Sequence, residues 1–218
     1  MKTKKPIAII PARVGSQRIR LKNVRLFHNK PLIYWTIKSA LESKVFSKIY
    51  ISTDGTIIKN ELNKFKKFKN KIFFLYRPKK LSGSKTKTSS LIKYLIKKNS
   101  LEKFFTDFIL LQPTSPLRKK EHIIKMWNIY KKYNLNDFFS VSEKKNKFAI
   151  NKNNRNIFYG ERKINSKKLK SIFQNGSIYI KNLQSFKKDP NFVTKNSNLY
   201  FMNKRVSLDV DTLKDLEK

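Results

Sequence analysis

The first apolar run of the sequence and the loop after it constrain the fold more than any other feature. Residues 7–10 are continuously apolar, which is typical of a short strand buried on both faces. In the following loop, Gly15 and Ser16 allow backbone N–H groups to approach an anion, and Arg13 and Lys22 supply positive charge. The loop has neither the lysine ending of a P-loop nor the spaced glycines of a dinucleotide-binding loop. It therefore predicts a strand followed by a phosphate-binding loop of a third kind.

Strand-like and helix-like segments alternate through the first two-thirds of the chain. After the first strand, hydrophobic periodicity predicts helices at residues 31–43, 56–68, 88–99 and 118–133, and strands at residues 48–52, 72–75 and 105–112. This alternation is typical of a three-layer α/β domain, in which a mostly parallel sheet carries helices on both faces. Ligands of such sheets bind beyond the carboxyl ends of the strands, where the loops of Arg13, Asp54 and Gln112 are expected.

Four ordered blocks of sequence resemble the N-acylneuraminate cytidylyltransferases, the CMP-sialic acid synthetases. They are I-I-P-A-R-V-G-S-Q-R-I-R-L-K-N at residues 9–23, I-S-T-D at 51–54, L-L-Q-P-T-S-P-L-R at 110–118, and N-G-S-I-Y at 175–179 with S-L-D-V-D-T at 207–212. One block would arise easily by chance, but four in this order are specific. The resemblance implies a fold like that of the nucleotide-diphospho-sugar transferases, with CTP and a nine-carbon sugar acid as substrates.

The resemblance also assigns residues to the nucleotide. It implies that Arg13 and Lys22 contact the triphosphate and act in catalysis, that Asn23 reads the cytosine, and that Ser16, Arg77 and Ser90 make further contacts with CTP. An amide suits cytosine because it can both donate and accept hydrogen bonds. Solvated surface charge is the alternative for the two basic residues, but their position in a loop after a buried strand favours a functional role. A local turn bond is the alternative for Ser16.

An Asp-x-Asp pattern late in the sequence predicts a site for a divalent cation. Asp209 and Asp211 are two positions apart, so on an extended strand both carboxylates point the same way and can share one hard cation. Asp211 can equally serve as the N-cap of a last helix. The resemblance favours metal ligands, with Mg²⁺ or Mn²⁺ as cofactor and Asp211 in catalysis. No general base is evident, because His28 is expected in a loop and His122 on a helix surface.

The resemblance places the sugar against three side chains. Gln112 follows a predicted strand, and its neutral amide suits sugar hydroxyls or an N-acyl group. Asn175 and Tyr179 are expected along the same pocket, with Ile178 and Ile180 facing away from Tyr179 on a strand. The alternative for Asn175 is a plain turn, since Asn-Gly is a strong turn signal.

The sequence departs from the family pattern on the sugar side. Residues 84–87 contain no acid, and Phe173 stands where a basic residue often precedes Asn-Gly. A desolvated sugar carboxylate needs a partner, and we expect Arg162 to supply it. Arg118, in the third of the blocks, can have a structural role instead of a role in the site, by anchoring the start of the following helix. These departures leave legionaminic, pseudaminic or 3-deoxy-octulosonic acid as alternative acceptors.

Residues 143–171 break the alternation of strands and helices. They are polar and rich in Lys and Asn, with short apolar islands at residues 148–150 and 157–159. This composition fits either a disordered insert or a β-rich arm. The resemblance favours a dimerisation arm that joins two subunits and adds residues to the neighbouring site. With no linker to divide the chain, residues 1–218 are expected to form one domain.

The formal net charge of +37 raises the alternative of a nucleic-acid-binding protein without catalysis. However, only 9 of the 51 basic residues are Arg, and the lysines are spread along the whole chain rather than gathered on one face. No apolar run approaches the roughly 20 residues of a membrane span, and Pro11 and Arg13 interrupt the first apolar segment. The chain has no cysteine, which is compatible with a reducing compartment. We therefore expect a cytoplasmic, homodimeric enzyme that binds no specific nucleic acid and no membrane.

Overall fold

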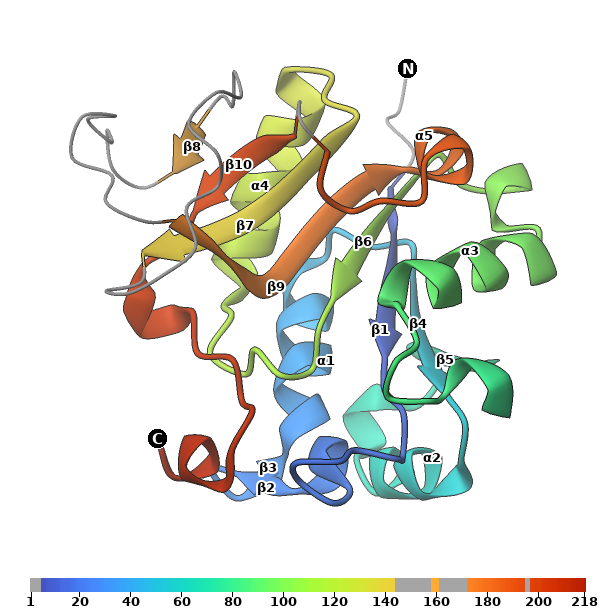
Figure 1. Ribbon diagram of the computed structural model, residues 1–218, viewed down its shortest axis with the longest axis vertical. Helices are drawn as coiled ribbons and strands as arrows, with labels where there is room; N and C mark the ends of the chain where they lie inside the picture. Colours follow the sequence, from blue (N-terminus) through green and yellow to red (C-terminus); the bar gives the residue numbers. More distant parts are fainter. Residues whose placement is uncertain (1–4, 144–157, 161–171, 195–196) are drawn as a thin grey trace.

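Figure 1 shows the fold in a computed structural model, which describes residues 5–143, 158–160, 172–194 and 197–218. One eight-stranded sheet runs through the molecule. Its strands, in spatial order, are β5 (Ile72–Tyr76), β4 (Lys48–Thr53), β1 (Ile7–Pro11), β6 (Asp107–Leu111), β9 (Ile172–Asn182), β7 (Asp137–Glu143), β10 (Asn198–Phe201) and β8 (Phe158–Gly160). β9 is antiparallel to β6 and β7, and the other pairings between these strands are parallel. The predicted mostly parallel sheet is confirmed. β2 (Leu26–Phe27) and β3 (Lys30–Pro31) form a separate antiparallel pair.

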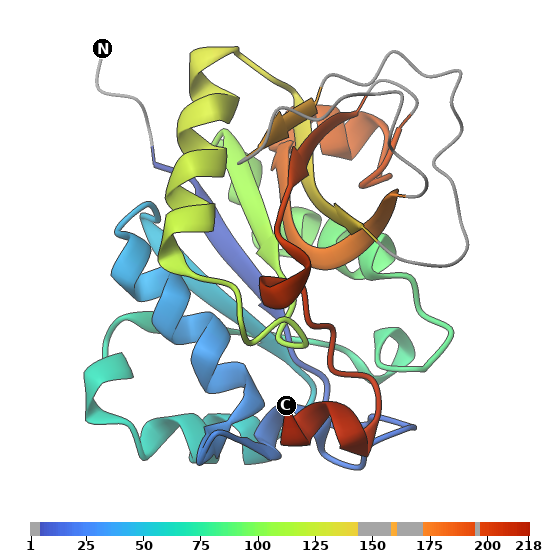
Figure 2. The same ribbon diagram turned by 90° about the vertical axis from the view of Figure 1, so that its left-hand side faces the viewer.

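Helices cover both faces of the sheet. One face carries α1 (Leu32–Ser43), α2 (Thr56–Asn63) and α4 (Lys120–Lys132), and the other carries α3 (Thr88–Lys98) and α5 (Leu183–Lys188). Figures 1 and 2 show α1 and α4 following each other along one side. In β1, Ala8 and Ile10 enter the apolar cluster under α1 and α4, whereas Ile7 and Ile9 enter the cluster under α3 and α5. All four are fully buried, as a parallel strand covered on both faces requires.

Two predicted helices are shorter in the structure. α2 ends at Asn63 rather than near residue 68, and a separate 3₁₀ turn follows it. The helix stops because Phe65 and Phe68 turn back onto Tyr34, with ring centroids 4.9 and 5.2 Å from that ring. α4 begins two residues later than predicted, because Arg118 points into the interior and is only 2% exposed.

The segment after β10 returns to the N-terminal loop. Residues 207–211 belong to no helix and pair with no strand among those the structure describes, so the prediction that the two aspartates lie on a strand is wrong. Val210 anchors this segment, because its N–H donates to the carbonyl of Thr114 at 2.8 Å and its buried side chain packs with Ile19. Burial still alternates along this segment as it would on a strand, since Val210 is buried between two solvent-accessible aspartates.

A 3₁₀ helix (Leu213–Glu217) follows this segment and lies next to β2 (Figure 1). Its N-cap is Thr212, whose hydroxyl and N–H both donate to Oδ2 of Asp215 at 2.8 and 2.9 Å. The alternative role of Asp211 as the helix cap is therefore wrong, and its carboxylate is left for other partners.

The predicted dimerisation arm at residues 143–171 lies largely outside the described residues. Within it, β8 pairs in parallel with β10 at the edge of the sheet. Arg162 is not among the described residues. No helix in the described part of the chain is both long enough and apolar enough to span a bilayer.

Candidate active site

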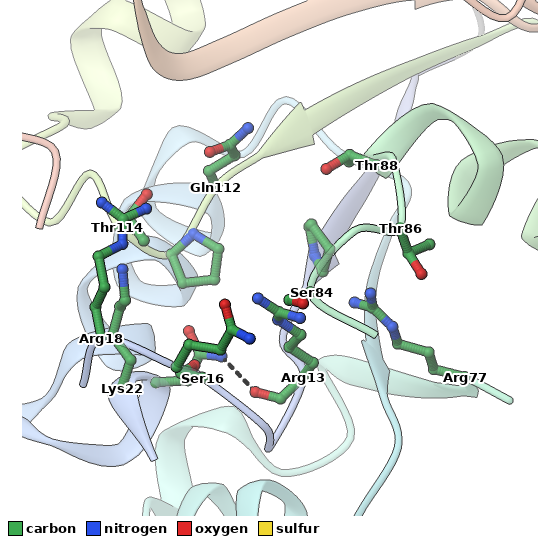
Figure 3. Close-up of a pocket in the computed structure, with 14 residues that line it drawn as sticks. Arg13, Ser16, Arg18, Lys22, Arg77, Ser84, Thr86, Thr88, Gln112 and Thr114 are labelled. Atoms are coloured by element: carbon green, nitrogen blue, oxygen red, sulfur yellow. Dashed lines mark hydrogen bonds between the residues drawn. The ribbon is translucent and has the colours of Figure 1, made fainter. Parts of the chain in front are cut away.

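A cavity of about 410 Å³ lies at the carboxyl ends of β1 and β6, where the sequence predicted ligand binding (Figure 3). Four of the described residues that line it are cationic and none is acidic. Of the residues predicted from the sequence, those that line the cavity are Arg13, Ser16, Lys22, Asn23, Arg77 and Gln112. A concave, polar and cationic cavity of this size suits a multiply charged anion such as a nucleotide.

Two side chains hold the N-terminal loop in shape. Oδ1 of Asp54, which follows β4, accepts a hydrogen bond from the N–H of Val14 at 2.8 Å. Nδ2 of the buried Asn23 donates to the carbonyl of Arg13 at 2.9 Å. Because of this bond, Asn23 shapes the loop in addition to lining the cavity. Gly55 allows the loops after β1 and β4 to touch, because a Cβ there would lie only 2.7 Å from Cγ2 of Val14.

Arg13 and Arg77 form one cationic side of the cavity (Figure 3). Nη1 of Arg13 donates to the carbonyl of Ser82 at 3.2 Å, and Nε and Nη2 of Arg77 donate to the carbonyl of Leu81 at 3.0 and 2.7 Å. Burial lowers the pKa of Arg77; the charge of Asp54 opposes this change, and the charge of Arg13 adds to it. Because the two guanidinium groups repel each other, an anion bound beside them would be stabilised.

Arg18 and Lys22 form the second cationic side, next to Thr114 in Figure 3. Nη1 of Arg18 lies 2.8 Å from Oδ2 of Asp211, and Nζ of Lys22 lies 3.1 Å from Oδ1 of the same carboxylate. Nζ of Lys22 also donates to the carbonyl of Val210 at 2.7 Å. These contacts connect the N-terminal loop to the aspartate pair.

The aspartate pair fits a divalent cation. Asp209 keeps an exposed surface, yet the surrounding protein displaces enough water to raise the pKa of its carboxyl; a hydrogen bond from Thr114 acts against this rise, and the charge of Asp211 adds to it. Two carboxylates that repel each other are stabilised by a cation, and Mg²⁺ often combines one or two carboxylates with substrate phosphate oxygens. Within the described residues, His, Cys, Asp and Glu nowhere gather in a group of three or more. The pair therefore suits a cation shared with a bound phosphate.

Gly176 separates a predicted sugar contact from a predicted metal ligand. Because β9 is antiparallel to β6 and its Ile178 pairs with the last residue of β6, the residues of β9 before Ile178 lie beyond the carboxyl end of β6. Gly176 has φ +70°, and a Cβ there would lie 3.3 Å from Oε1 of Gln112 and 3.9 Å from Oδ2 of Asp209. A larger residue would be strained and would crowd Gln112. Gly176 therefore keeps the space between the amide and the carboxylate open.

Asn175 is buried within β9, where the register with β7 shifts, and does not line the cavity. Its Oδ1 accepts from the hydroxyl of Ser140 at 2.6 Å and from the N–H of Ser177 at 3.1 Å, and its Nδ2 donates to the hydroxyl of Ser207 at 3.0 Å. These bonds tie β9 to β7 and to the segment that carries the aspartates. They give Asn175 a structural role, but the predicted plain turn is wrong, because Asn175 and Gly176 lie inside β9 at an irregularity in its pairing with β7.

Tyr179 is also buried and outside the cavity lining. Its ring stacks on Phe139 at 5.9 Å between centroids, on the face of the sheet that α3 and α5 cover. Ile178 and Ile180 pack on the opposite face, as predicted. Burial and the negative charge of Asp209 raise the pKa of the Tyr179 hydroxyl, which therefore stays protonated at neutral pH.

Three other predicted positions lie away from the cavity. Ser90 is exposed in the first turn of α3, whereas Thr88, which begins that helix, lines the cavity. His28 lies in a turn with φ +47°, as expected of a loop residue. His122 is buried rather than on the helix surface, because its Nδ1 accepts from the N–H of Lys119 and caps α4. Neither histidine is placed to act as a general base.

Arg118 has the structural role given above as an alternative, because it anchors the chain before α4 to neighbouring elements. Its Nη1 donates to the carbonyl of Ser177 at 2.7 Å and to that of Gln112 at 3.3 Å, and its Nη2 donates to the hydroxyl of Thr36 at 2.7 Å. Burial lowers the pKa of Arg118 to about 9, so the guanidinium is still charged at neutral pH. It joins α1, β6 and β9 directly beneath the cavity.

Comparison with known proteins identifies the family. The profile described as cytidylyltransferase matches residues 7–214. The chain belongs to this family. The N-acylneuraminate cytidylyltransferase of Escherichia coli O18:K1:H7 is 33% identical over 224 residues, which cover 98% of this chain and 51% of that protein. The chain thus spans about half the length of that curated relative.

Two further relatives are similar along almost their whole length. A pseudaminic acid cytidylyltransferase of Campylobacter jejuni is 27% identical over 222 residues, covering 98% of this chain and 94% of that protein. The solved structure of CMP:2-keto-3-deoxy-manno-octonic acid synthetase complexed with CTP superposes with a TM-score of 0.69 at 15% identity, covering 98% of this chain and 96% of the other. The second likeness supports the cytidylyltransferase fold.

Four residues in or beside the cavity were not assigned from the sequence. Arg18 and Asp54 lie inside two of the blocks that resemble the family, so their positions were available but their partners were not. The Asn-Gly dipeptide signalled the positive φ of Gly176 without showing what lay beside it. Thr88 carried no signal, because a threonine that starts a helix is common whether or not it meets a ligand.

Proposed function

We propose that this chain transfers CMP from CTP to the anomeric hydroxyl of a nonulosonic acid, a nine-carbon 2-keto sugar acid, with release of pyrophosphate. The observation that carries the proposal is a cationic cavity whose Arg18 and Lys22 contact the carboxylate of Asp211, in a chain of the cytidylyltransferase family. The cationic sides suit the triphosphate, and the amide of Gln112 at the upper rim in Figure 3 suits polar groups of the sugar.

In this mechanism Arg13, Arg77 and Lys22 hold the phosphates from two sides. The anomeric oxygen attacks the α-phosphorus, the bond from that phosphorus to the oxygen bridging to the β-phosphate breaks, and pyrophosphate leaves. The cations stabilise the negative charge that develops on the leaving group. A Mg²⁺ or Mn²⁺ ion held by Asp209 and Asp211 would neutralise the triphosphate and lower the pKa of the attacking hydroxyl.

The names of the related proteins support the class of acceptor. The Escherichia coli protein is named for N-acylneuraminate and the Campylobacter jejuni protein for pseudaminic acid, both nonulosonic acids. N-acylneuraminate is the acceptor we propose, since the relatives named for it are 31 and 33% identical over nearly the whole chain, against 27% for the one named for pseudaminic acid. The relative named for diacetyllegionaminic acid is 36% identical but matches only 57% of this chain. The homodimer, the arm at residues 143–171, the contact between Arg162 and the sugar carboxylate, and the cytoplasmic location remain parts of this proposal.

A pyrophosphate-release assay tests the proposal. CTP and Mg²⁺ are offered with N-acetylneuraminic, legionaminic, pseudaminic or 3-deoxy-octulosonic acid, and we expect turnover to be fastest with N-acetylneuraminic acid. UTP and GTP serve as nucleotide controls. Fastest turnover with another acid would replace the acceptor and keep the reaction. Sequence-selective nucleic-acid binding at physiological salt, with no turnover of CTP on any acid, would overturn the proposed function.

A further inference from the structure

Arg18 differs from the other cationic residues of the cavity in what holds it. Arg13 and Arg77 donate to backbone carbonyls, and Lys22 is 12% exposed and tied to the carbonyl of Val210. Arg18 instead reaches the Asp211 carboxylate, and its side chain is 67% exposed. Little packing would be lost if it moved.

Two cationic side chains neutralise Asp211. Arg18 contacts its Oδ2 and Lys22 its Oδ1, so both carboxylate oxygens already meet a cation. A divalent cation that approached Asp211 would meet these two positive charges. The exposed ion pair of Arg18 contributes at most about 1 kcal/mol, which is small enough to be exchanged for another partner.

A triphosphate offers that other partner. Arg18 lines the same cavity as Arg13 and Arg77, so a bound nucleotide would bring several anionic oxygens within its reach. Guanidinium groups bind phosphate oxygens in a bidentate manner with greater strength than a single exposed carboxylate contact. Transfer of Arg18 from Asp211 to the nucleotide would uncover one carboxylate oxygen and remove one positive charge from its surroundings.

We propose that Arg18 couples nucleotide binding to cation binding, by covering Asp211 in the free protein and releasing it to the divalent cation when the triphosphate enters. This inference rests on the proposed function, since it takes Asp211 to be a metal ligand and the cavity to be the nucleotide site. It assigns Arg18 a positioning role, separate from catalysis. The protein would then bind the cation weakly alone and more tightly with nucleotide.

Binding measurements without turnover test this role. The affinity for Mn²⁺ alone is measured from the loss of the free-ion EPR signal, and the affinity for CTP by calorimetry with and without Mg²⁺, all in the absence of sugar. The variant is Arg18→Gln. The matched control is Arg20→Gln, which removes the same charge from an exposed position in the same loop that does not line the cavity.

We expect Arg18→Gln to tighten Mn²⁺ binding about two- to fivefold, the range that up to about 1 kcal/mol allows, and to weaken CTP binding. Arg20→Gln should change each affinity by much less. Equal effects of the two variants on Mn²⁺ would overturn the coupling role, as would tighter Mn²⁺ binding with unchanged CTP binding. If Asp209→Asn and Asp211→Asn leave Mn²⁺ binding unaltered, the metal assignment of the proposed function fails instead.

Discussion

The two halves of the sheet use their polar residues differently. In the half formed by β4, β1 and β6, the predicted residues Arg13 and Gln112 follow strand ends and line the cavity. In the half formed by β9, β7 and β10, the predicted residues Asn175 and Tyr179 are buried and outside its lining. Both pairs were assigned to the site by the same kind of resemblance.

The direction of the strands explains this difference. A chain that leaves a parallel strand at its carboxyl end enters a loop, where polar side chains are free to face a ligand. β9 instead runs into the sheet from that edge, so its side chains alternate between the two apolar clusters. A polar group such as Asn175 must then find its partners inside the protein. In this chain, the motif residues on the antiparallel strand are therefore buried in the structure, whereas those after the parallel strands line the cavity.

The largest effect is expected at the carboxylates that join the two halves. Asp209→Asn keeps the size of the side chain but removes a charge from the proposed cation site, so turnover should fall at least about a hundredfold. The thermal midpoint should stay close to that of the original protein, because Asp209 forms no part of the apolar core. Steady-state kinetics at saturating Mg²⁺ measure the first effect and calorimetry the second.

Asp189→Asn is the control for this prediction, since it makes the same chemical change at an exposed position away from the cavity. Near-original turnover of Asp209→Asn would show that the aspartate pair does not hold a catalytic cation. The aspartate segment would then have no functional connection with the cavity of the parallel half.

The parallel half should respond through binding of CTP. Arg13→Ala removes a charged donor from the cavity, and we expect the KM for CTP to rise about ten- to a hundredfold, as the loss of about 1.5 to 3 kcal/mol implies. Nonspecific association with DNA should barely change, because one charge among 51 basic residues contributes little to a diffuse field. Lys97→Ala, an exposed change on α3, is the control. An equal loss of CTP and DNA binding would favour the nucleic-acid alternative.

The antiparallel half should respond through stability. Asn175→Ala leaves the N–H of Ser177 without its partner and removes one hydrogen bond from each of the hydroxyls of Ser140 and Ser207, which keep backbone partners. The free energy of unfolding should therefore fall by about 1 to 3 kcal/mol. Urea denaturation measures the change, and the exposed Asn191→Ala is the matched control. Unchanged stability with a raised KM for the sugar would move Asn175 into the site.

The smallest effect is expected at Tyr179. Its hydroxyl lies 3.5 Å from Oε1 of Gln174, a weak contact, so Tyr179→Phe should change stability by less than about 1 kcal/mol and each KM by less than about twofold. Kinetics with both substrates varied separately measure this. A severalfold rise in the KM for the sugar alone would restore Tyr179 as a sugar contact and break the comparison between the two halves.

The sequence predicted those elements whose structure depends on neighbouring residues. β4, β1 and β6, the three strands of the parallel half, were predicted within a few residues, because their apolar runs are buried on both faces and flanked by helices. The insertion of β9 between β6 and β7 was not predicted, since it depends on pairings between distant segments. The same limit applies to the site, where Lys22 was assigned from its loop, but its contacts with Val210 and Asp211 span 188 and 189 positions.

The contact between Lys22 and Val210 has a consequence for synthesis of the chain. Chains emerge from the ribosome N-terminus first, and the N-terminal elements are available to fold while later ones are still being made. The loop that carries Arg13 and Lys22 can therefore form long before Asp209 and Asp211 exist. On the proposed function, a nascent chain could bind the nucleotide through this loop but would lack the carboxylates that bind the cation. Closure of the site is thus a late event, which requires that nearly all of the described sequence has been made and has folded back onto its beginning.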